Sequence, residues 1–123
     1  MKAALKAINF HYLVPAFYFS NRTQLKVFLV KQLKKEGKEV EAINFIFCDD
    51  TYLLEINQQY LNHDTLTDII TFELSPKSQP LVSDIYISVE RVRDNASQFT
   101  THFSKELHRV IFHGCLHLAG YKD

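Results

Sequence analysis

The sequence predicts an α+β fold: a single domain in which helices pack against a four-stranded sheet. Its length of 123 residues corresponds to about one domain. Short segments with alternating apolar residues, rich in β-branched and aromatic types, predict strands, and segments of helical periodicity lie between them. The resulting order is β-α-β-α-β-β-α-α, with no linker, repeat or low-complexity tract between the elements.

The first half of the chain is expected to contain two strands and two helices. These are a strand over residues 8–13, a helix over 22–36, a strand over 41–48 and a helix over 50–61. Asn21 can cap the first helix and Gly37 can end it, while Asp49 or Asp50 can cap the second. Two apolar stripes are expected on these helices: Leu25, Phe28, Leu29 and Leu33 on the first, and Leu53, Ile56 and Tyr60 on the second.

The second half is expected to contain two strands followed by two helices. A polar loop over residues 62–67 precedes strands over 68–74 and 82–89, which a loop containing Pro76 and Pro80 separates. Helices are expected over about 90–100 and 104–118, and Gly120 is suited to a helix end.

Composition and charge exclude several classes of protein. Lys and Arg number 14, as do Asp and Glu, so any nucleic-acid binding must come from a local patch. Four lysines near the end of the first predicted helix could form such a patch, although a solvated surface is the ordinary interpretation of such charges. They are Lys31, Lys34, Lys35 and Lys38. Two cysteines, Cys48 and Cys115, do not form a disulfide framework and indicate a reducing compartment. No apolar stretch approaches the roughly 20 residues of a membrane-spanning helix, so a cytoplasmic protein without membrane contact is expected.

The last predicted helix carries two histidines, His113 and His117, four residues apart. At about 100° per residue they project from one face, where their ring nitrogens can bind a single divalent ion. Glu106 and Arg109 share that face. The opposite face is expected to belong to the core and consists of Leu107, Ile111, Cys115 and Leu118.

A catalytic zinc site requires three protein ligands and one open position. Gly120 allows the chain to turn after the helix, so that Asp123 can supply the third ligand in the spacing His-x3-His-x5-Asp. Two ordinary histidines at this spacing are equally compatible with the residues. Gly114 stands where the metalloprotease motif His-Glu-x-x-His has its glutamate, which argues against peptide hydrolysis.

Three blocks of sequence together resemble the YbeY family. Residues 113–123 are similar to the family pattern His-Gly-x-Leu-His-Leu-x-Gly-Tyr-Asp-His. Residues 57–72 are similar to Asn-x-x-Tyr-Arg-x-x-Asp-x-Pro-Thr-Asp-Val-Leu-Ser-Phe. Residues 84–88 are similar to the strand pattern Gly-Asp-Ile-x-Ile-Ser, with Ser83 in place of the glycine. The resemblance covers the chain from about Ile43 to its end. It implies a mixed sheet with helices, one zinc ion, and endoribonuclease activity in the maturation of bacterial ribosomal RNA.

The resemblance also assigns roles to particular residues. It implies that His113, His117 and Asp123 are metal ligands. It further implies a group around the metal or in a substrate loop, namely Asn57, Asp64, Thr67 and Asp68. Read without the resemblance, the last three suit a turn held by Asp and Thr side chains, and Asn57 suits an amide that ties down a loop backbone. His63 and His102 are rival ligands outside the family's ligand positions.

Three departures from the family pattern bear on chemistry. Asp123 replaces the third histidine, and a carboxylate ligand also suits harder ions such as manganese. Leu61 replaces an arginine, so another cation would have to handle phosphate. The candidates are Arg109, which is also the candidate catalytic residue, together with Arg91 and Arg93. Leu66 replaces a proline, which alters only a turn.

These observations support two hypotheses about function. The first is a metal-dependent endoribonuclease for single-stranded RNA that acts on ribosomal RNA, with the small ribosomal subunit as partner. The alternative is a non-catalytic RNA-binding or ribosome-assembly factor with a structural metal site. Family members continue past the motif, so a single domain over residues 1–123 without their C-terminal extension is expected. The residues do not indicate the oligomeric state.

Overall fold

The computed structural model describes residues 2–17, 19–62 and 67–121. These residues form four strands and five helices. The strands are β1 (Ile8–Tyr12), β2 (Val40–Cys48), β3 (Ile69–Glu73) and β4 (Leu81–Ser88). The helices are α1 (Lys2–Ala7), α2 (Arg22–Lys35), α3 (Asp50–Leu61), α4 (Val89–Gln98) and α5 (Phe103–Leu118). The expected α+β class and the expected order from β1 onward are confirmed.

The four strands form one mixed sheet in the order β1-β2-β4-β3. β1 and β4 both run parallel to β2, so Phe45 in β2 lies between Phe10 on one side and Ile85 on the other. β3 runs antiparallel to β4 and occupies the opposite edge of the sheet. The mixed sheet implied by the family resemblance is therefore confirmed.

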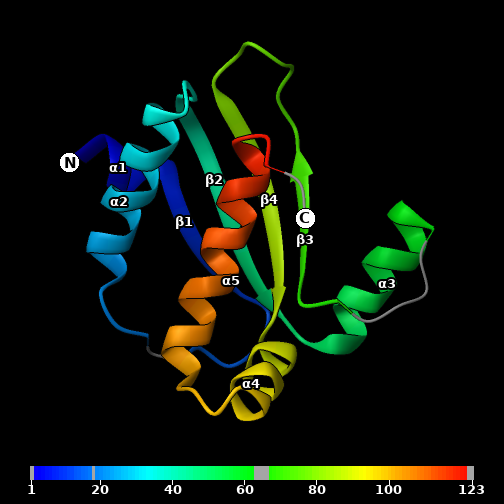
Figure 1. Ribbon diagram of the computed structural model, residues 1–123. Coiled ribbons are helices and arrows are strands. Elements are labelled where there is room, and N and C mark those ends of the chain that lie inside the picture. Colours follow the sequence, from blue (N-terminus) through cyan, green and yellow to red (C-terminus); the bar gives the residue numbers. More distant parts are fainter. Residues whose placement is uncertain (1, 18, 63–66, 122–123) are drawn as a thin grey trace.

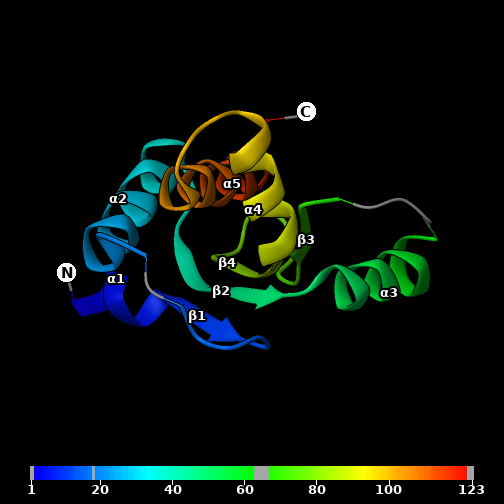
Figure 2. The same cartoon turned by 90° about the horizontal axis from the view of Figure 1, so that it is seen from below.

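The main core lies between one face of the sheet and the helices α2, α4 and α5. Alternate side chains of β2, among them Phe45 and Phe47, are fully buried on this face. They pack with Ile85 and Ile87 of β4, as expected for a sheet with one covered face. Figures 1 and 2 show α5 lying across the middle of this face, with α2 on one side of it and α4 near its beginning.

Helix α3 packs on the opposite face, near the β3 edge. A second, smaller core holds Cys48, Leu53, Ile56 and Ile70. Tyr86 of β4 packs against it, and this residue points away from the main core because it alternates with Ile85 and Ile87 along the strand. In Figure 2, α3 extends beyond the edge of the sheet on the side away from α4 and α5.

Several local predictions are confirmed and others are wrong. Asp49 caps α3, where its carboxylate accepts a hydrogen bond from the Tyr52 N–H at 2.8 Å. Asn21 is the N-cap residue of α2, as predicted, but its backbone is left-handed with φ 61° and its side chain forms no cap hydrogen bond. Phe28 and Tyr60 are 44% and 64% exposed, so the predicted apolar stripes are only partly buried. Helix α1 is absent from the predicted elements because its six residues are too few to show a helical period.

Helix boundaries differ from the predicted ones by a few residues. α4 begins directly after β4, because Ser88 ends the strand and its hydroxyl accepts the Arg91 N–H at 3.3 Å. Gly37 and Gly120 follow α2 and α5 with φ of +78° and +102°, a left-handed conformation that favours glycine. None of the helices among the described residues is long and apolar enough to cross a membrane.

Candidate metal centre

Helix α5 packs closely against the sheet at Gly114. A Cβ atom added at this residue would lie 2.9 Å from Ile69 Cδ1 and 3.3 Å from Ile85 Cδ1. The glycine therefore allows α5 to rest directly on β3 and β4. Packing against the sheet thus explains the glycine at the position where the metalloprotease motif has its glutamate.

The two histidines of α5 lie next to each other, as their spacing predicts. Their ring centroids are 5.0 Å apart with an interplanar angle of 47°, and both side chains are half-buried. The opposite face of the helix belongs to the core, where Leu107, Ile111 and Leu118 are at most 2% exposed. The predicted division of α5 into a histidine face and a core face is confirmed.

A complete ligand set is not visible in the described part of the chain. Asp123, the predicted third ligand, lies outside the described residues. Within residues 2–17, 19–62 and 67–121, no group of three His, Cys, Asp or Glu side chains could hold a metal ion. The chemistry of the two imidazoles fits zinc and similar divalent ions, which histidine binds through neutral ring nitrogens. Two donors supply only part of such a site.

The other histidines and cysteines of the described residues face elsewhere. His108 hydrogen-bonds the Ser20 carbonyl at 3.2 Å through Nε2 and contacts the ring of Phe19. His102 is exposed at the beginning of α5. Cys115 is buried on the core face, and burial raises the pKa of its thiol to about 12, which disfavours the thiolate form that binds metals. The remaining rival ligand, His63, lies outside the described residues.

A charged cluster lies about one helical turn before His113. Arg109 donates to Glu106 through Nε at 2.8 Å and through Nη2 at 2.6 Å. Arg109 Nη2 lies 3.8 Å from Asp68 Oδ2, and the Asn95 amide donates to the same oxygen at 3.3 Å. We call Asp68, Asn95, Glu106 and Arg109 the α5 charge cluster. It joins α4 and α5 to the residue that precedes β3.

The interactions within this cluster favour the charged forms of Glu106 and Arg109. Hydrogen bonds from Arg109 lower the pKa of Glu106, although burial of this carboxylate acts in the opposite direction. The same hydrogen bonds raise the pKa of Arg109. Arg109 is half exposed, with 52% of its side chain accessible, and its third guanidinium nitrogen, Nη1, takes no part in these contacts. The guanidinium therefore keeps donors for a ligand while Glu106 fixes its position.

The predicted loop residues have structural contacts where they are described. Thr67 donates its hydroxyl hydrogen to the Ile69 carbonyl at 3.4 Å, and the Asp68 carbonyl accepts from the Ser88 N–H at 3.0 Å. Asn57 is 3% exposed, more deeply buried than expected. Asp64 lies outside the described residues. The structure therefore brings Asp68 alone of this group into contact with Arg109 among the residues it describes.

The other candidate cations are engaged away from the histidines. Arg91 binds Asp50 at 3.1 Å and Asp94 at 2.9 Å, where β2 and β4 end. The Arg93 guanidinium lies 4.4 Å from the centre of the Phe103 ring. Leu61, at the position of the family's arginine, is 41% exposed at the end of α3. Arg109 thus remains the cation that shares a helix face with the two histidines.

Sequence reasoning missed Asn95 and the pairing of Arg109 with Glu106. Asn95 lies on α4, and its contact with Asp68 joins residues 27 positions apart, so no local pattern signals it. Glu106 and Arg109 are three residues apart, which is the spacing of a helical ion pair. That spacing was a usable signal for the pairing.

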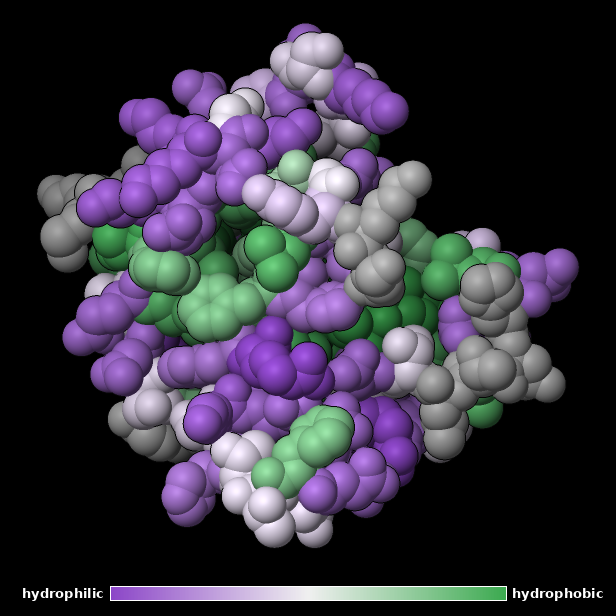
Figure 3. All heavy atoms as spheres, in the orientation of Figure 1, coloured by the Kyte–Doolittle hydropathy of each residue, from purple (hydrophilic) through white to green (hydrophobic). Residues whose placement is uncertain are grey.

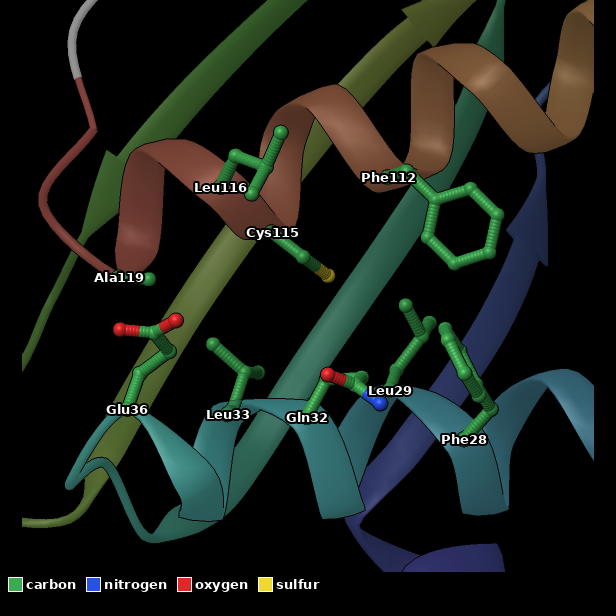
Figure 4. Close-up of a pocket in the computed structure, with 9 residues that line it drawn as sticks. All are labelled: Phe28, Leu29, Gln32, Leu33, Glu36, Phe112, Cys115, Leu116 and Ala119. Atoms are coloured by element: carbon green, nitrogen blue, oxygen red, sulfur yellow. The ribbon is translucent and has the colours of Figure 1, made fainter.

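An apolar pocket of about 320 Å³ lies on the other side of α5, between this helix and α2 (Figure 4). Phe28 and Phe112 pack against each other at one end, with ring centroids 5.4 Å apart. The Cys115 side chain points toward α2 in this pocket. Among the residues that the structure describes, neither a cationic side chain nor a histidine lines this pocket, so it is separate from the candidate metal centre.

The mixed sheet and the paired histidines of the last helix define a small α+β protein with a candidate metal centre. Residues 17–123 match the family model described as "Endoribonuclease YbeY". The chain belongs to the YbeY family.

Individual relatives agree with this assignment. Endoribonuclease YbeY of Flavobacterium psychrophilum is 51% identical over 116 residues, which cover 94% of this chain and 81% of the relative. The protein of the same name from Cytophaga hutchinsonii is 44% identical over 107 residues, covering 87% of this chain and 75% of the relative. The solution structure of TM1509 from Thermotoga maritima matches with a TM-score of 0.58 and 32% identity, covering 94% of this chain and 73% of that structure.

Proposed function

We propose that this protein is a metal-dependent endoribonuclease that cleaves single-stranded segments of ribosomal RNA during its maturation. The observation that carries the proposal is the pair of adjacent imidazoles on α5, one turn after the charge cluster. The relatives named endoribonuclease supply the reaction class. Precursor ribosomal RNA and the small ribosomal subunit are the proposed partners, and the cytoplasm is the proposed place of action.

His113, His117 and Asp123 are the proposed ligands of one zinc ion. The carboxylate of Asp123 also suits manganese, so the identity of the ion is part of the proposal. When bound, a divalent ion supplies Lewis acidity that polarises a phosphate oxygen and increases the acidity of water. Both histidines are half-buried, so packing restricts their orientation while part of each residue remains accessible.

Arg109 is the proposed contact to a phosphate near the cleaved bond. Glu106 holds the guanidinium through two hydrogen bonds and thereby limits its rotation. Nη1 lies outside this pairing and can donate to a phosphate oxygen, where the positive charge offsets charge that develops in the transition state. Asp68 and Glu106 reduce the net positive charge around Arg109, so its contribution is expected to be positional as much as electrostatic.

Two observations favour the alternative of a non-catalytic RNA-binding factor with a structural metal site. Leu61 stands in place of the family's arginine, and Arg109 is compensated by two carboxylates. In that case the ion would only order the C-terminal segment. The two functions make different predictions for a histidine variant.

The experiment compares RNA cleavage by the wild type, His117→Ala and the control His102→Ala. His102 precedes α5, is exposed and makes no side-chain cap bond, so its variant controls for loss of a histidine away from the paired imidazoles. A single-stranded fragment of precursor ribosomal RNA is the substrate, with and without EDTA, and thermal unfolding is followed in parallel. We expect His117→Ala and EDTA to reduce cleavage by at least about 100-fold, because metal ligands and their supports contribute on this scale.

The outcomes distinguish the two functions. Loss of cleavage in His117→Ala, with the control active and both variants folded, supports the endoribonuclease. Absence of cleavage in the wild type under every metal condition, together with a lowered melting temperature in His117→Ala, contradicts it and supports the structural role of the ion.

A further inference from the structure

A second pocket, of about 480 Å³, lies at the turn between α4 and α5. It is lined by Phe99, Thr101, Lys105, Glu106 and Arg109. The pocket shares Arg109 and Glu106 with the charge cluster and thus adjoins the proposed site. In the orientation of Figure 3, the surface over α4 and the start of α5 is mainly hydrophilic and includes an isolated hydrophobic area.

Phe99 offers an aromatic face in this pocket. Its side chain is 63% exposed, although phenylalanine is normally a core residue. The turn that presents it is held by backbone hydrogen bonds, from the Phe99 N–H to the Asn95 carbonyl at 2.9 Å and from the Thr101 N–H to the Ala96 carbonyl at 2.9 Å. The ring is therefore displayed on a fixed turn between two helices. A single exposed aromatic residue does not by itself indicate a binding site, so the inference depends on the residues around Phe99.

The neighbours are the cations Lys105 and Arg109. Both are exposed, and they lie four residues apart, on one face of α5. Lys105 forms no ion pair within the described part of the chain, whereas Glu106, which is 2% exposed, compensates Arg109. The pocket thus combines an aromatic face with an uncompensated ammonium group and a held guanidinium.

The same spacing continues to the proposed metal ligands. Lys105, Arg109, His113 and His117 follow one another at intervals of four residues, a rise of about 6 Å per interval along the helix axis. They form a continuous stripe that turns slowly around α5. The pocket at the beginning of the helix is therefore joined to the paired histidines near its end by a track of nitrogen-bearing side chains.

We infer that this pocket binds one nucleotide of the single-stranded RNA substrate, with its base stacked on Phe99 and its phosphate held by Lys105 and Arg109. Aromatic side chains stack bases of any sequence because every base has a π-face, and Lys and Arg bind the phosphates between them. The inference rests on the proposed function, since it places an RNA strand along α5 toward His113 and His117. It adds a substrate subsite that contributes affinity without base-specific readout.

The test uses a fluorescent reporter of stacking. The chain contains no tryptophan, so Phe99→Trp creates a protein with a single indole. Leu74→Trp is the matched control, because Leu74 is 57% exposed and follows β3 at the end of this strand remote from Asp68. A six-nucleotide single-stranded RNA is titrated into each as-purified protein and checked for integrity on a gel. We expect saturable quenching of indole fluorescence in Phe99→Trp and no quenching in Leu74→Trp.

Two further measurements separate stacking from phosphate binding. Phe99→Ala is expected to weaken binding of the same RNA by about tenfold or more, within the range measured for loss of one base–aromatic stack. Lys105→Ala is expected to reduce the slope of log affinity against log salt by about one. Inorganic polyphosphate is the anion control and should not quench the indole of Phe99→Trp.

Failure of the subsite and failure of the proposed function are distinguishable. If the wild type cleaves RNA but RNA does not quench Phe99→Trp and Phe99→Ala binds normally, the subsite is wrong and the endoribonuclease stands. If Phe99→Trp is quenched and the wild type never cleaves, the subsite stands and the catalytic proposal fails. Equal quenching by polyphosphate, or a loss of affinity matched by Leu74→Ala, would overturn the subsite as a place of base stacking.

Discussion

Glu106 carries a buried carboxylate, and the ion pair with Arg109 stabilises its charge. The side chain of Glu106 is 3% exposed, whereas that of Arg109 is 52% exposed. This asymmetry means that the two residues depend on their pairing to different degrees. Arg109 without its partner can be solvated by water, whereas Glu106 without its partner remains buried with an unmatched charge.

We predict that Arg109→Ala is more destabilising than Glu106→Gln at pH 7. The first variant should lose about 1–3 kcal/mol because the carboxylate of Glu106 keeps its burial and loses its charged donor. The second should lose less than about 1 kcal/mol, since glutamine preserves the volume and one acceptor and leaves Arg109 half exposed. Chemical denaturation of both variants measures the difference, and equal losses would contradict this account of the pair.

The same pair predicts the direction of a pH effect. In the wild type the pKa of Glu106 is lowered, chiefly by hydrogen bonds from Arg109, so its stabilising contribution is present above the unfolded pKa and is lost as pH falls through the folded pKa. In Arg109→Ala, burial without the guanidinium raises the pKa of Glu106. Protonation of Glu106 as pH falls therefore removes part of the variant's loss of stability. The difference in unfolding free energy between the two proteins should therefore shrink from pH 7 to about pH 4. A constant difference would argue against an ionised Glu106.

Among elements, α5 carries most of the candidate site, and its seating on the sheet depends on Gly114. Alanine normally stabilises a helix relative to glycine by about 0.5–1 kcal/mol. At this position its Cβ would lie within 3.4 Å of three carbon atoms of Ile69 and Ile85. Overpacking of a filled core costs about 1–3 kcal/mol, so the usual gain should be reversed.

We predict that Gly114→Ala lowers stability and that Ile69→Val reduces this loss. Valine lacks the Cδ1 methyl group that gives the shortest contact, 2.9 Å, so the added Cβ would have room on that side. A double-mutant cycle on the melting temperature measures the coupling between the two positions. Strictly additive effects would show that α5 does not contact β3 in this way.

The elements also show what a local pattern can and cannot predict. All four strands were predicted, two of them from alternation, and the Asp49 cap and the core face of α5 follow directly from sequence spacing. Asn21 occupies the N-cap position but forms no side-chain cap bond, and its backbone is left-handed, which residue type alone does not specify. Phe28 and Tyr60 fit their helical stripes and contact Phe112 and Phe72, yet both stay largely exposed, because exposure depends on tertiary placement.

At the scale of the whole molecule, the sequence could not provide the strand order or the long-range contacts. The order β1-β2-β4-β3 places β4 between strands that precede it in the chain, and no local residue pattern encodes such a crossover. For the same reason the contact of Asp68 with Asn95 and Arg109 was not predicted. The paired histidines were predictable because both belong to one helix, whereas Asp123 and Asp64 lie outside the described residues and remain predictions.

The overall charge also has a functional consequence. The chain has as many acidic as basic residues, so it lacks a general attraction for RNA, and affinity must come from local groups such as the stripe along α5. Binding of a short single strand should accordingly show a shallow salt dependence, because few phosphates are contacted. Wild-type affinity measured across a range of salt concentrations tests this, and a slope typical of many phosphate contacts would point to an additional surface, such as the basic side of α2.

Binding of a divalent metal ion by His113 and His117 underlies the proposed function, and elemental mass spectrometry of purified, untagged protein measures it. Wild type, His117→Ala and the control His102→Ala are compared as purified and after incubation with zinc followed by dialysis. We predict about one zinc per chain in the wild type and in His102→Ala, and a large loss in His117→Ala. Metal-free wild-type protein after zinc incubation, or equal zinc in His117→Ala, would contradict the claim.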